Sequence, residues 1–254
     1  MRTLCGFSLS VAVAGLFAAG SSAADGVSDL DDAVARMQYA YFTAEARSVQ
    51  DALAIVQRVQ LPASMQGMKE YFTAYGQWKL AELHTDEAAA GRREARGAAT
   101  KAAAACVKAA EEAQRLDARF GEPFAIEAIC SSLASRTSDS CGKNKDLRTA
   151  LELTPGNPRV LLIDAQCAAD GDKSDASATV ERLRGVVQAF EAAPPSRPGR
   201  PDWGQPEALL MLGQAYLQRG DALAARDVIE RALVIAPDYR KARDALETAA
   251  TRPR

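Results

Sequence analysis

The chain has 254 residues, of which 48% are hydrophobic and 25% are charged, and its formal net charge is −2. This composition excludes a disordered or collagen-like chain. It also argues against a nucleic-acid partner, because no surplus of basic side chains exists to neutralise phosphates. A single histidine excludes a metal site built from several histidines. The 53 alanines favour helices, since alanine has the highest helix propensity.

The first 24 residues have the pattern of an export signal. Arg2 supplies a positive start, residues 9–19 are apolar, and small residues follow. We expect cleavage near Ala23 or Ala24 and a periplasmic or secreted chain over residues 25–254. An uncleaved membrane anchor is the alternative, but the apolar stretch is shorter than the roughly 20 residues that a bilayer requires. No later segment is apolar enough to span a membrane, so no stable span is expected after signal removal.

Aromatic residues gather near the N-terminus, where seven of the 15 lie within residues 39–78. Tyr71, Tyr75 and Trp78 share one helical face at positions i, i+4 and i+7. Such a stripe forms either the core between helices or the wall of a ligand pocket or dimer contact. The pocket interpretation supports an alternative function, a helical enzyme or solute-binding protein with its pocket at this aromatic cluster.

Removal of the signal leaves four cysteines in a compartment that would be oxidising, namely Cys106, Cys130, Cys141 and Cys167. Two disulfides are therefore expected, and three connectivities are open. The cysteines lack the close spacing of a zinc site, and the lone histidine is remote from them in sequence. No metal and no cofactor are expected.

Catalytic motifs are missing from the sequence. It contains no G-x-S-x-G elbow, phosphate-binding loop, H-E-x-x-H motif or dinucleotide fingerprint. His84 has Asp86 and Glu87 nearby, but a lone histidine near a helix end is far more often a surface or capping residue. We therefore expect a protein that is not an enzyme.

Five of the 11 prolines lie between Pro194 and Pro206. This segment cannot be helical throughout and is expected to form an exposed loop. Trp203 within it either anchors a partner, as exposed aromatic residues often do, or folds back onto the helical pair that follows.

Residues 206–239 predict two antiparallel helices separated by Gly220. The inner stripe of the first consists of Leu209, Leu212, Gly213 and Tyr216, and that of the second of Ala225, Ile229, Ala232 and Leu233. The pattern Leu209-x2-Leu212-Gly213-x2-Tyr216, followed by Ala225-x3-Ile229 and Pro237, resembles the 34-residue tetratricopeptide repeat (TPR) family. Leu209 stands where that family usually has tryptophan.

The resemblance implies an all-α fold, a right-handed superhelical solenoid of helix–turn–helix repeats in a single domain. The segments before residue 206 match the repeat pattern less completely. Phe72-x2-Tyr75-Gly76, for example, is followed by Lys79 in place of an aromatic residue. The expected units are an N-terminal helical pair at 27–60, divergent repeats at 65–120, 121–157 and 158–205, the clear repeat at 206–239, and a capping helix at 240–252.

The resemblance also implies a groove lined by the first helix of each repeat. A glutamine follows the small residue of three such helices, at Gln77, Gln166 and Gln214. These amides either hold an extended peptide backbone or merely keep the surface soluble. Further groove candidates in the clear repeat are Glu207, Leu210, Leu217 and Gln218. The expected function is a non-catalytic scaffold or adaptor in the bacterial cell envelope that binds a protein or extended peptide.

The repeat register further implies a disulfide pairing. It places Cys106 near the start of one second helix and Cys130 near the end of the next first helix, where antiparallel helices meet. Cys141, in a loop between helices, and Cys167, near the end of the following first helix, lie at the same edge. The register therefore implies Cys106–Cys130 and Cys141–Cys167. It disfavours Cys130–Cys167, because neighbouring helix axes lie roughly 8–10 Å apart.

Overall fold

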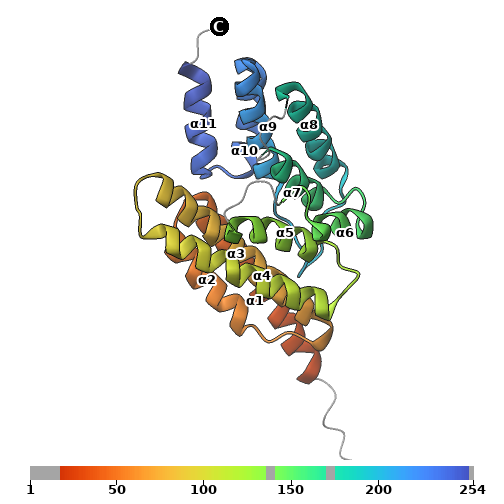
Figure 1. Cartoon of the computed structure of the whole chain (residues 1–254). Coiled ribbons are helices and arrows are strands. Elements are labelled where there is room, and N and C mark those ends of the chain that lie inside the picture. The colour runs from red at the N-terminus through yellow and green to blue at the C-terminus, as the bar shows by residue number, and fades with distance from the viewer. Residues whose placement is uncertain (1–17, 136–140, 170–174, 252–254) are drawn as a thin grey trace, which may run out of the picture.

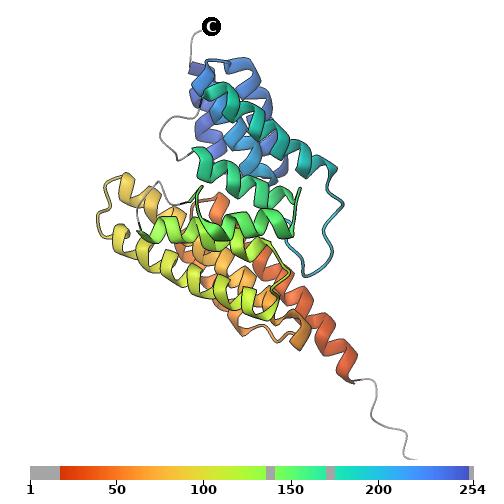
Figure 2. The same cartoon turned by 45° about the vertical axis from the view of Figure 1, so that its right-hand side comes forward.

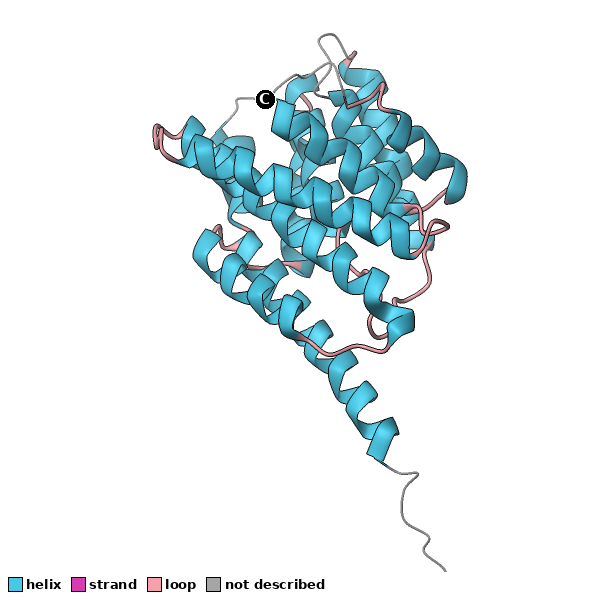
Figure 3. Cartoon of the chain, turned by 60° about the horizontal axis from the view of Figure 1, so that its bottom comes forward, coloured by secondary structure: helices cyan, strands magenta, loops and turns pink. Residues whose placement is uncertain are grey.

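The computed structural model describes residues 18–135, 141–169 and 175–251, and the described residues contain eleven α-helices and one 3₁₀ turn. The helices are α1 (Ala18–Phe42), α2 (Ala46–Arg58), α3 (Gln66–Ala89), α4 (Ala95–Leu116), α5 (Glu122–Ser135), α6 (Lys145–Leu153), α7 (Pro158–Ala169), α8 (Ala176–Ala192), α9 (Gln205–Arg219), α10 (Ala222–Ile235) and α11 (Arg240–Thr251). The 3₁₀ turn is η1 (Ala63–Met65). Within these ranges the structure has no strand (Figure 3), which confirms the all-α class.

The helices stack in chain order as antiparallel pairs, from α1 and α2 at one end to α9, α10 and α11 at the other (Figure 1). The most extensive contacts join α3 to α4, α4 to α5, α9 to α10 and α1 to α2, so each helix packs mainly on its neighbours in sequence. This nearest-neighbour packing is the arrangement of a helical repeat protein. Each of the five expected pairs contains two of the helices, and α11 (Arg240–Thr251) lies within the expected capping helix.

Side-chain caps fix the start of three helices. Asn144 accepts a hydrogen bond from the backbone N–H of Asp146, Asp175 from that of Ser177, and Asp221 from that of Ala224, at 2.8, 3.1 and 3.1 Å. Each cap satisfies a backbone donor that has no partner inside its helix. These short polar residues therefore set where α6, α8 and α10 begin.

Gly213 lies where the two helices of the clear repeat, α9 and α10, approach each other closely. A Cβ atom added at Gly213 on α9 would lie 2.4 Å from Ile229 Cγ1 on α10. The helices approach so closely because this position carries no side chain.

We expect Gly213→Ala to lower the free energy of unfolding by about 1–3 kcal/mol, because an extra methyl group overpacks this contact. Gly185→Ala is the matched control, since a Cβ atom there meets nothing within 4 Å on exposed α8. That variant should gain about 0.5–1 kcal/mol from helix propensity. Urea denaturation of both variants measures the difference. Equal changes in the free energy of unfolding for the two variants would contradict the close packing at Gly213.

Two disulfides join the helices of the central pairs. Cys106 on α4 bonds to Cys130 on α5, and Cys141 bonds to Cys167 on α7, with Cα separations of 6.1 and 5.2 Å. These are the pairs that the repeat register implied. Cys106 lies in the middle of α4 rather than near its start, because α4 already begins at Ala95.

Loss of either disulfide is expected to destabilise the fold. The bonded residues are 24 and 26 positions apart, and loops of this size restrict the unfolded chain by about 3 kcal/mol in the chain-entropy description. We expect a loss of this order when Cys106 and Cys130 are both replaced by alanine, and no change for the control Cys5→Ala in the predicted signal. Denaturation curves measure the loss. Peptide mapping without reductant that yields a Cys130–Cys167 peptide would contradict the pairing.

The aromatic stripe of α3 is core. Tyr71, Tyr75 and Trp78 are at most 1% exposed. Trp203, only 1% exposed, stacks on Tyr75 with ring centroids 4.9 Å apart and meets Trp78 edge-on at 5.5 Å. Trp203 is thus not an exposed anchor, and its aromatic partners and the acceptor of its indole N–H lie on α3. Trp203 fills the space beside Tyr75, and the alternative function, a helical enzyme or solute-binding protein with its pocket at the aromatic cluster, is not favoured.

The segment that carries Trp203, residues 193–204, is here called the proline-rich strap. It leaves α8, runs along the stack toward α1 and returns to α9 (Figure 2). The N–H of Gly199 donates to the carboxylate of Asp31 at 2.8 Å, and Asp202 accepts from Gln38 at 2.8 Å. Gly199 has φ +70°, and a Cβ atom there would lie 2.6 Å from Met65. Much of the strap is exposed, as expected, but Gly199 and the C-terminal end of the strap, at Asp202 and Trp203, are fixed to the first two helical pairs.

The ends of the stack also meet on one side. The ring of Tyr239, just before α11, lies 4.7 Å from that of Phe42 and 6.3 Å from that of Tyr41, at the end of α1. Lys241 at the start of α11 pairs with Asp86 of α3 at 2.6 Å. The inner face of the stack is therefore partly closed by the chain itself.

None of the helices in the described ranges is both long and apolar enough to cross a membrane. The signal-peptide prediction falls largely on residues 1–17, which lie outside the described residues. The predicted cleavage site lies within the first two turns of α1.

Candidate functional site

A cavity of about 270 Å³, here called the central cavity, lies between α3, α7 and α9 and is bordered by the end of α1 and the start of α11. Its polar lining consists of Lys79, Glu82, Gln166, Glu207, Gln214 and Lys241. Its aromatic lining consists of Tyr41, Trp78 and Tyr239. Three first helices of the repeat stack thus contribute to one polar cavity.

Four of the seven predicted groove residues line this cavity, namely Gln166, Glu207, Leu210 and Gln214. The other three lie elsewhere. Gln77 is half-buried on α3, Leu217 is buried in the core, and Gln218 is exposed. Leu210 is also largely buried, at 3% exposure. Of the three predicted glutamines, those on α7 and α9 line the cavity and Gln77 on α3 does not.

Lys79 is the buried cation of the central cavity, with only 2% of its side chain exposed. Its Nζ lies 3.2 Å from Glu82 Oε2 and 3.7 Å from Glu207 Oε1. The same Nζ lies 3.8 Å from the centroid of the Trp78 ring and 4.5 Å from that of Tyr41. Carboxylate and aromatic faces together replace the water that this ammonium group loses on burial.

Glu82 is fully paired. Besides Lys79, its carboxylate accepts a hydrogen bond from the amide of Gln166 on α7 at 3.1 Å. Burial by itself raises the pKa of this carboxyl, but the charges of Lys79 and Lys241 and this hydrogen bond outweigh burial and hold the pKa below its ordinary value. Glu82 therefore stays ionised and fixes Gln166 at the cavity wall.

Glu207 has the opposite environment. Its residue is 6% exposed, and neither carboxylate oxygen accepts a hydrogen bond of ordinary geometry. Burial raises the pKa of this carboxyl, although Lys79 and the backbone amides at the start of α9 oppose the rise. A buried carboxylate without hydrogen bonds is costly, so Glu207 is the least satisfied group of the cavity.

The tyrosines around the cavity are neutral at physiological pH. Burial, reinforced by the nearby carboxylates, raises the pKa of Tyr41 and Tyr239 well above its ordinary value. Their rings therefore present uncharged aromatic faces to whatever enters the cavity.

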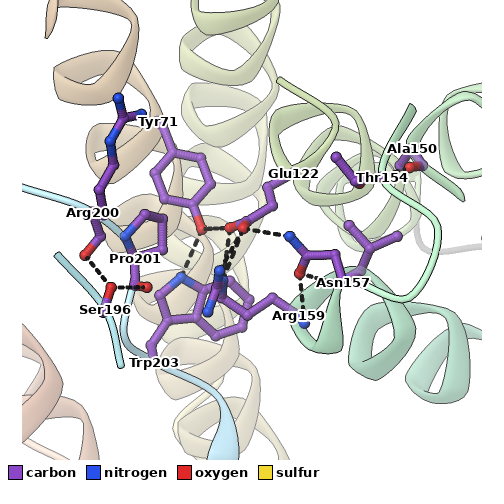
Figure 4. A network of polar contacts seen from close by, with 11 residues as sticks. Tyr71, Glu122, Ala150, Thr154, Asn157, Arg159, Ser196, Arg200, Pro201 and Trp203 are labelled. Carbon is purple, nitrogen blue, oxygen red and sulfur yellow. Dashed lines mark hydrogen bonds and ion pairs between the residues drawn. The ribbon is translucent and has the colours of Figure 1, made fainter. Parts of the chain in front are cut away.

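A second polar cluster, the Glu122 network, fixes the strap (Figure 4). Glu122 at the start of α5 is 3% exposed and accepts from the guanidinium of Arg159 through Nε at 2.9 Å and Nη2 at 2.8 Å. It also accepts from Asn157 at 2.8 Å and from the hydroxyl of Tyr71. That hydroxyl accepts in turn from Trp203 Nε1 at 2.7 Å. Helices α3, α5 and α7 and the strap thus share one hydrogen-bonded network.

A larger cavity of about 620 Å³ lies beside this network and is bordered by Phe120, Phe190 and the strap. Its charged walls include Arg159, which Glu122 already holds, and the exposed Arg197 and Arg200 of the strap. The polar groups that face it from the protein interior are thus satisfied by each other. No group of His, Cys, Asp or Glu side chains in the described part of the chain is arranged to hold a metal ion.

Sequence reasoning missed Lys79, Glu122 and Arg159 as site residues. The sequence does contain an indication of Lys79. This lysine stands where the repeat pattern has an aromatic residue, the position that Tyr216 occupies in the clear repeat. An unexpected charge on the inner face of a helix indicates a buried partner. The sequence contains no such indication of Glu122 or Arg159, since each stands near a helix start, where a polar residue is ordinary.

Fold and cavity together define an all-α stack of helical pairs with a polar cavity at its inner face. No model of a known protein family matches the chain, and no curated protein matches it. Among solved structures, the chain is similar to the crystal structure of YrrB, described as a TPR protein with an unusual peptide-binding site. The TM-score is 0.40 at 14% sequence identity, over 91% of this chain and 100% of that one.

Proposed function

We propose that this protein is a non-catalytic scaffold that binds a protein or an extended peptide at the central cavity. The observation that carries the proposal is the convergence of Gln166 of α7 and Gln214 of α9 on one cavity. Amide side chains both donate and accept hydrogen bonds, so the pair suits a peptide backbone. Gln214 is exposed and so can be reached from solvent.

We further propose that the protein acts in the bacterial cell envelope. The apolar N-terminal stretch with small residues after it supports export. Two disulfides suit an oxidising compartment. Fractionation of the cell, with N-terminal sequencing of the purified chain, tests this proposal. A mature start near Asp25 in the envelope fraction supports it, whereas an intact Met1 in the cytoplasm overturns it.

Affinity capture from envelope extract tests the binding function. The tagged wild-type chain is expected to retain a partner that the double variant Gln166→Ala/Gln214→Ala retains weakly. Gln77→Ala is the matched control, because Gln77 lies outside the cavity lining. Equal capture by the wild type and the double variant would show that the partner binds outside the central cavity. Loss of capture by Gln77→Ala alone would favour the continuous row of glutamines.

A further inference from the structure

One carboxylate of the central cavity, that of Glu207, is incompletely paired. Two carboxylates, Glu82 and Glu207, share the one ammonium group of Lys79, which lies closer to Glu82 at 3.2 Å than to Glu207 at 3.7 Å. The other lysine at the cavity, Lys241, already pairs with Asp86 at 2.6 Å. Glu207 thus has only the longer of the two ion pairs with Lys79, and its carboxylate oxygens have no hydrogen-bond partner.

We propose that the central cavity binds an arginine side chain of the partner peptide, with the carboxylate of Glu207 as its acceptor. This inference rests on the proposed peptide-binding function and names the chemistry that the cavity selects. A guanidinium group supplies a positive charge beside Glu207. It also supplies two parallel N–H donors that match the two carboxylate oxygens, which have no hydrogen-bond partner.

The walls and size of the cavity suit a single arginine side chain. Tyr41, Trp78 and Tyr239 line it, and a planar guanidinium stacks on aromatic faces better than a lysine ammonium does. The volume of about 270 Å³ is below the roughly 300–1,000 Å³ of pockets that hold whole small-molecule ligands. One side chain of a longer peptide fits this scale, with Gln166 and Gln214 beside it for the peptide backbone.

Access to Glu207 requires local side-chain movement, because its oxygens are buried. Leu210, Met211 and Gln214 follow Glu207 on the same face of α9, at i+3, i+4 and i+7, and all line the cavity. Met211 is an unbranched, adaptable side chain, and Gln214 is exposed. These two residues can give way without a change in the helix backbone.

Synthetic peptides test the proposal. The probe is acetyl-Gly-Ser-Arg-Ser-Gly-amide, and its counterparts carry citrulline or glutamate in place of arginine. The readout is the indole N–H signal of Trp78 in ¹⁵N NMR spectra, assigned with Trp203→Phe. We expect a saturable shift with the arginine peptide. Affinity should fall about tenfold or more for citrulline, which has the same shape without the charge.

Two variants of the chain complete the test. Glu207→Gln should weaken binding of the arginine peptide about tenfold or more. The protein should keep its thermal stability, because the substitution removes a costly buried charge. Met211→Arg places a cation four residues after Glu207, a favourable helical spacing, and should block the peptide without removing the carboxylate. Glu230→Gln on the exposed face of α10 is the control and should bind normally.

Several outcomes would overturn the arginine site. These are equal binding of the citrulline peptide, unchanged binding by folded Glu207→Gln, or no saturable shift with the arginine peptide. The hydroxyl of Tyr75 and the indole N–H of Trp78 are also buried without acceptors. If either pairs with Glu207, then Glu207→Gln lowers stability and leaves peptide binding unchanged, which also overturns the site.

The proposed scaffold function and the arginine site are distinguished by different outcomes. Capture that depends on Gln166 and Gln214 but not on Glu207 would keep the scaffold function and remove the arginine site. Specific binding of the arginine peptide without any captured partner would keep the arginine site and remove the evidence for a scaffold.

Discussion

Replacing Trp203 with alanine is expected to lower the free energy of unfolding by about 3–5 kcal/mol. The indole ring is 1% exposed, and it packs on Tyr75 and Trp78 of α3. Its N–H donates to Tyr71 at 2.7 Å. The substitution therefore opens a large cavity and leaves a buried hydroxyl of Tyr71 without one of its two partners. Guanidinium denaturation followed by circular dichroism measures the loss.

Release of the strap should accompany this loss. Because Trp203 holds the C-terminal end of residues 193–204 against α3, Trp203→Ala should expose the strap to a non-specific protease faster than it exposes the helices. Trp203→Phe is the matched control, since it keeps an aromatic ring and loses only the hydrogen bond, at a cost of about 1 kcal/mol. Equal proteolysis of the wild type and Trp203→Ala would show that Asp31 and Gln38 hold the strap without the tryptophan.

Removal of the Glu122 carboxylate is expected to have a comparable effect. Glu122→Ala should destabilise the protein by about 3–5 kcal/mol, the usual cost of breaking one partner of a buried ion pair. The reason is that the guanidinium of Arg159, whose side chain is 18% exposed, loses its counter-charge and three hydrogen bonds. Tyr71 and Asn157 lose an acceptor as well.

A double-mutant cycle separates the ion pair from the rest of the network. Glu122→Ala/Arg159→Ala should be less destabilised than the sum of the single variants, because no unpaired charge remains buried. Glu230→Ala, which breaks the exposed pair of Glu230 with Arg226, should leave stability unchanged within error. Strict additivity at Glu122 and Arg159 would show that the two charges do not stabilise one another.

Local patterns predicted the helical part of this structure well. The clear repeat needed only the spacing of Leu209, Leu212, Gly213 and Tyr216, since residues three and four apart share one helical face. The structure places α9 and α10 over that stretch. The implied pairing of Cys106 with Cys130 followed from the same register, because antiparallel neighbours bring those positions together.

The candidate site was predicted only in part. Gln166, Glu207, Leu210 and Gln214 were named from their positions on first helices, and all four line the central cavity. Gln77 was named by the same rule and lies outside the lining. The rule fails there because it treats every first helix alike, whereas α3 faces the cavity with Trp78, Lys79 and Glu82.

The sequence by itself determined that the chain is helical, where its helical pairs lie and which small residues let them pack, because these properties depend on residues within a few turns of one another. Only the tertiary structure decided that Trp203 packs on a helix 132 residues away from it, at Tyr71, and that Lys79 lies between Glu82 and Glu207. Such contacts have no period in the sequence. They arise when the whole stack closes, and burial then makes an unpaired charge or polar group costly.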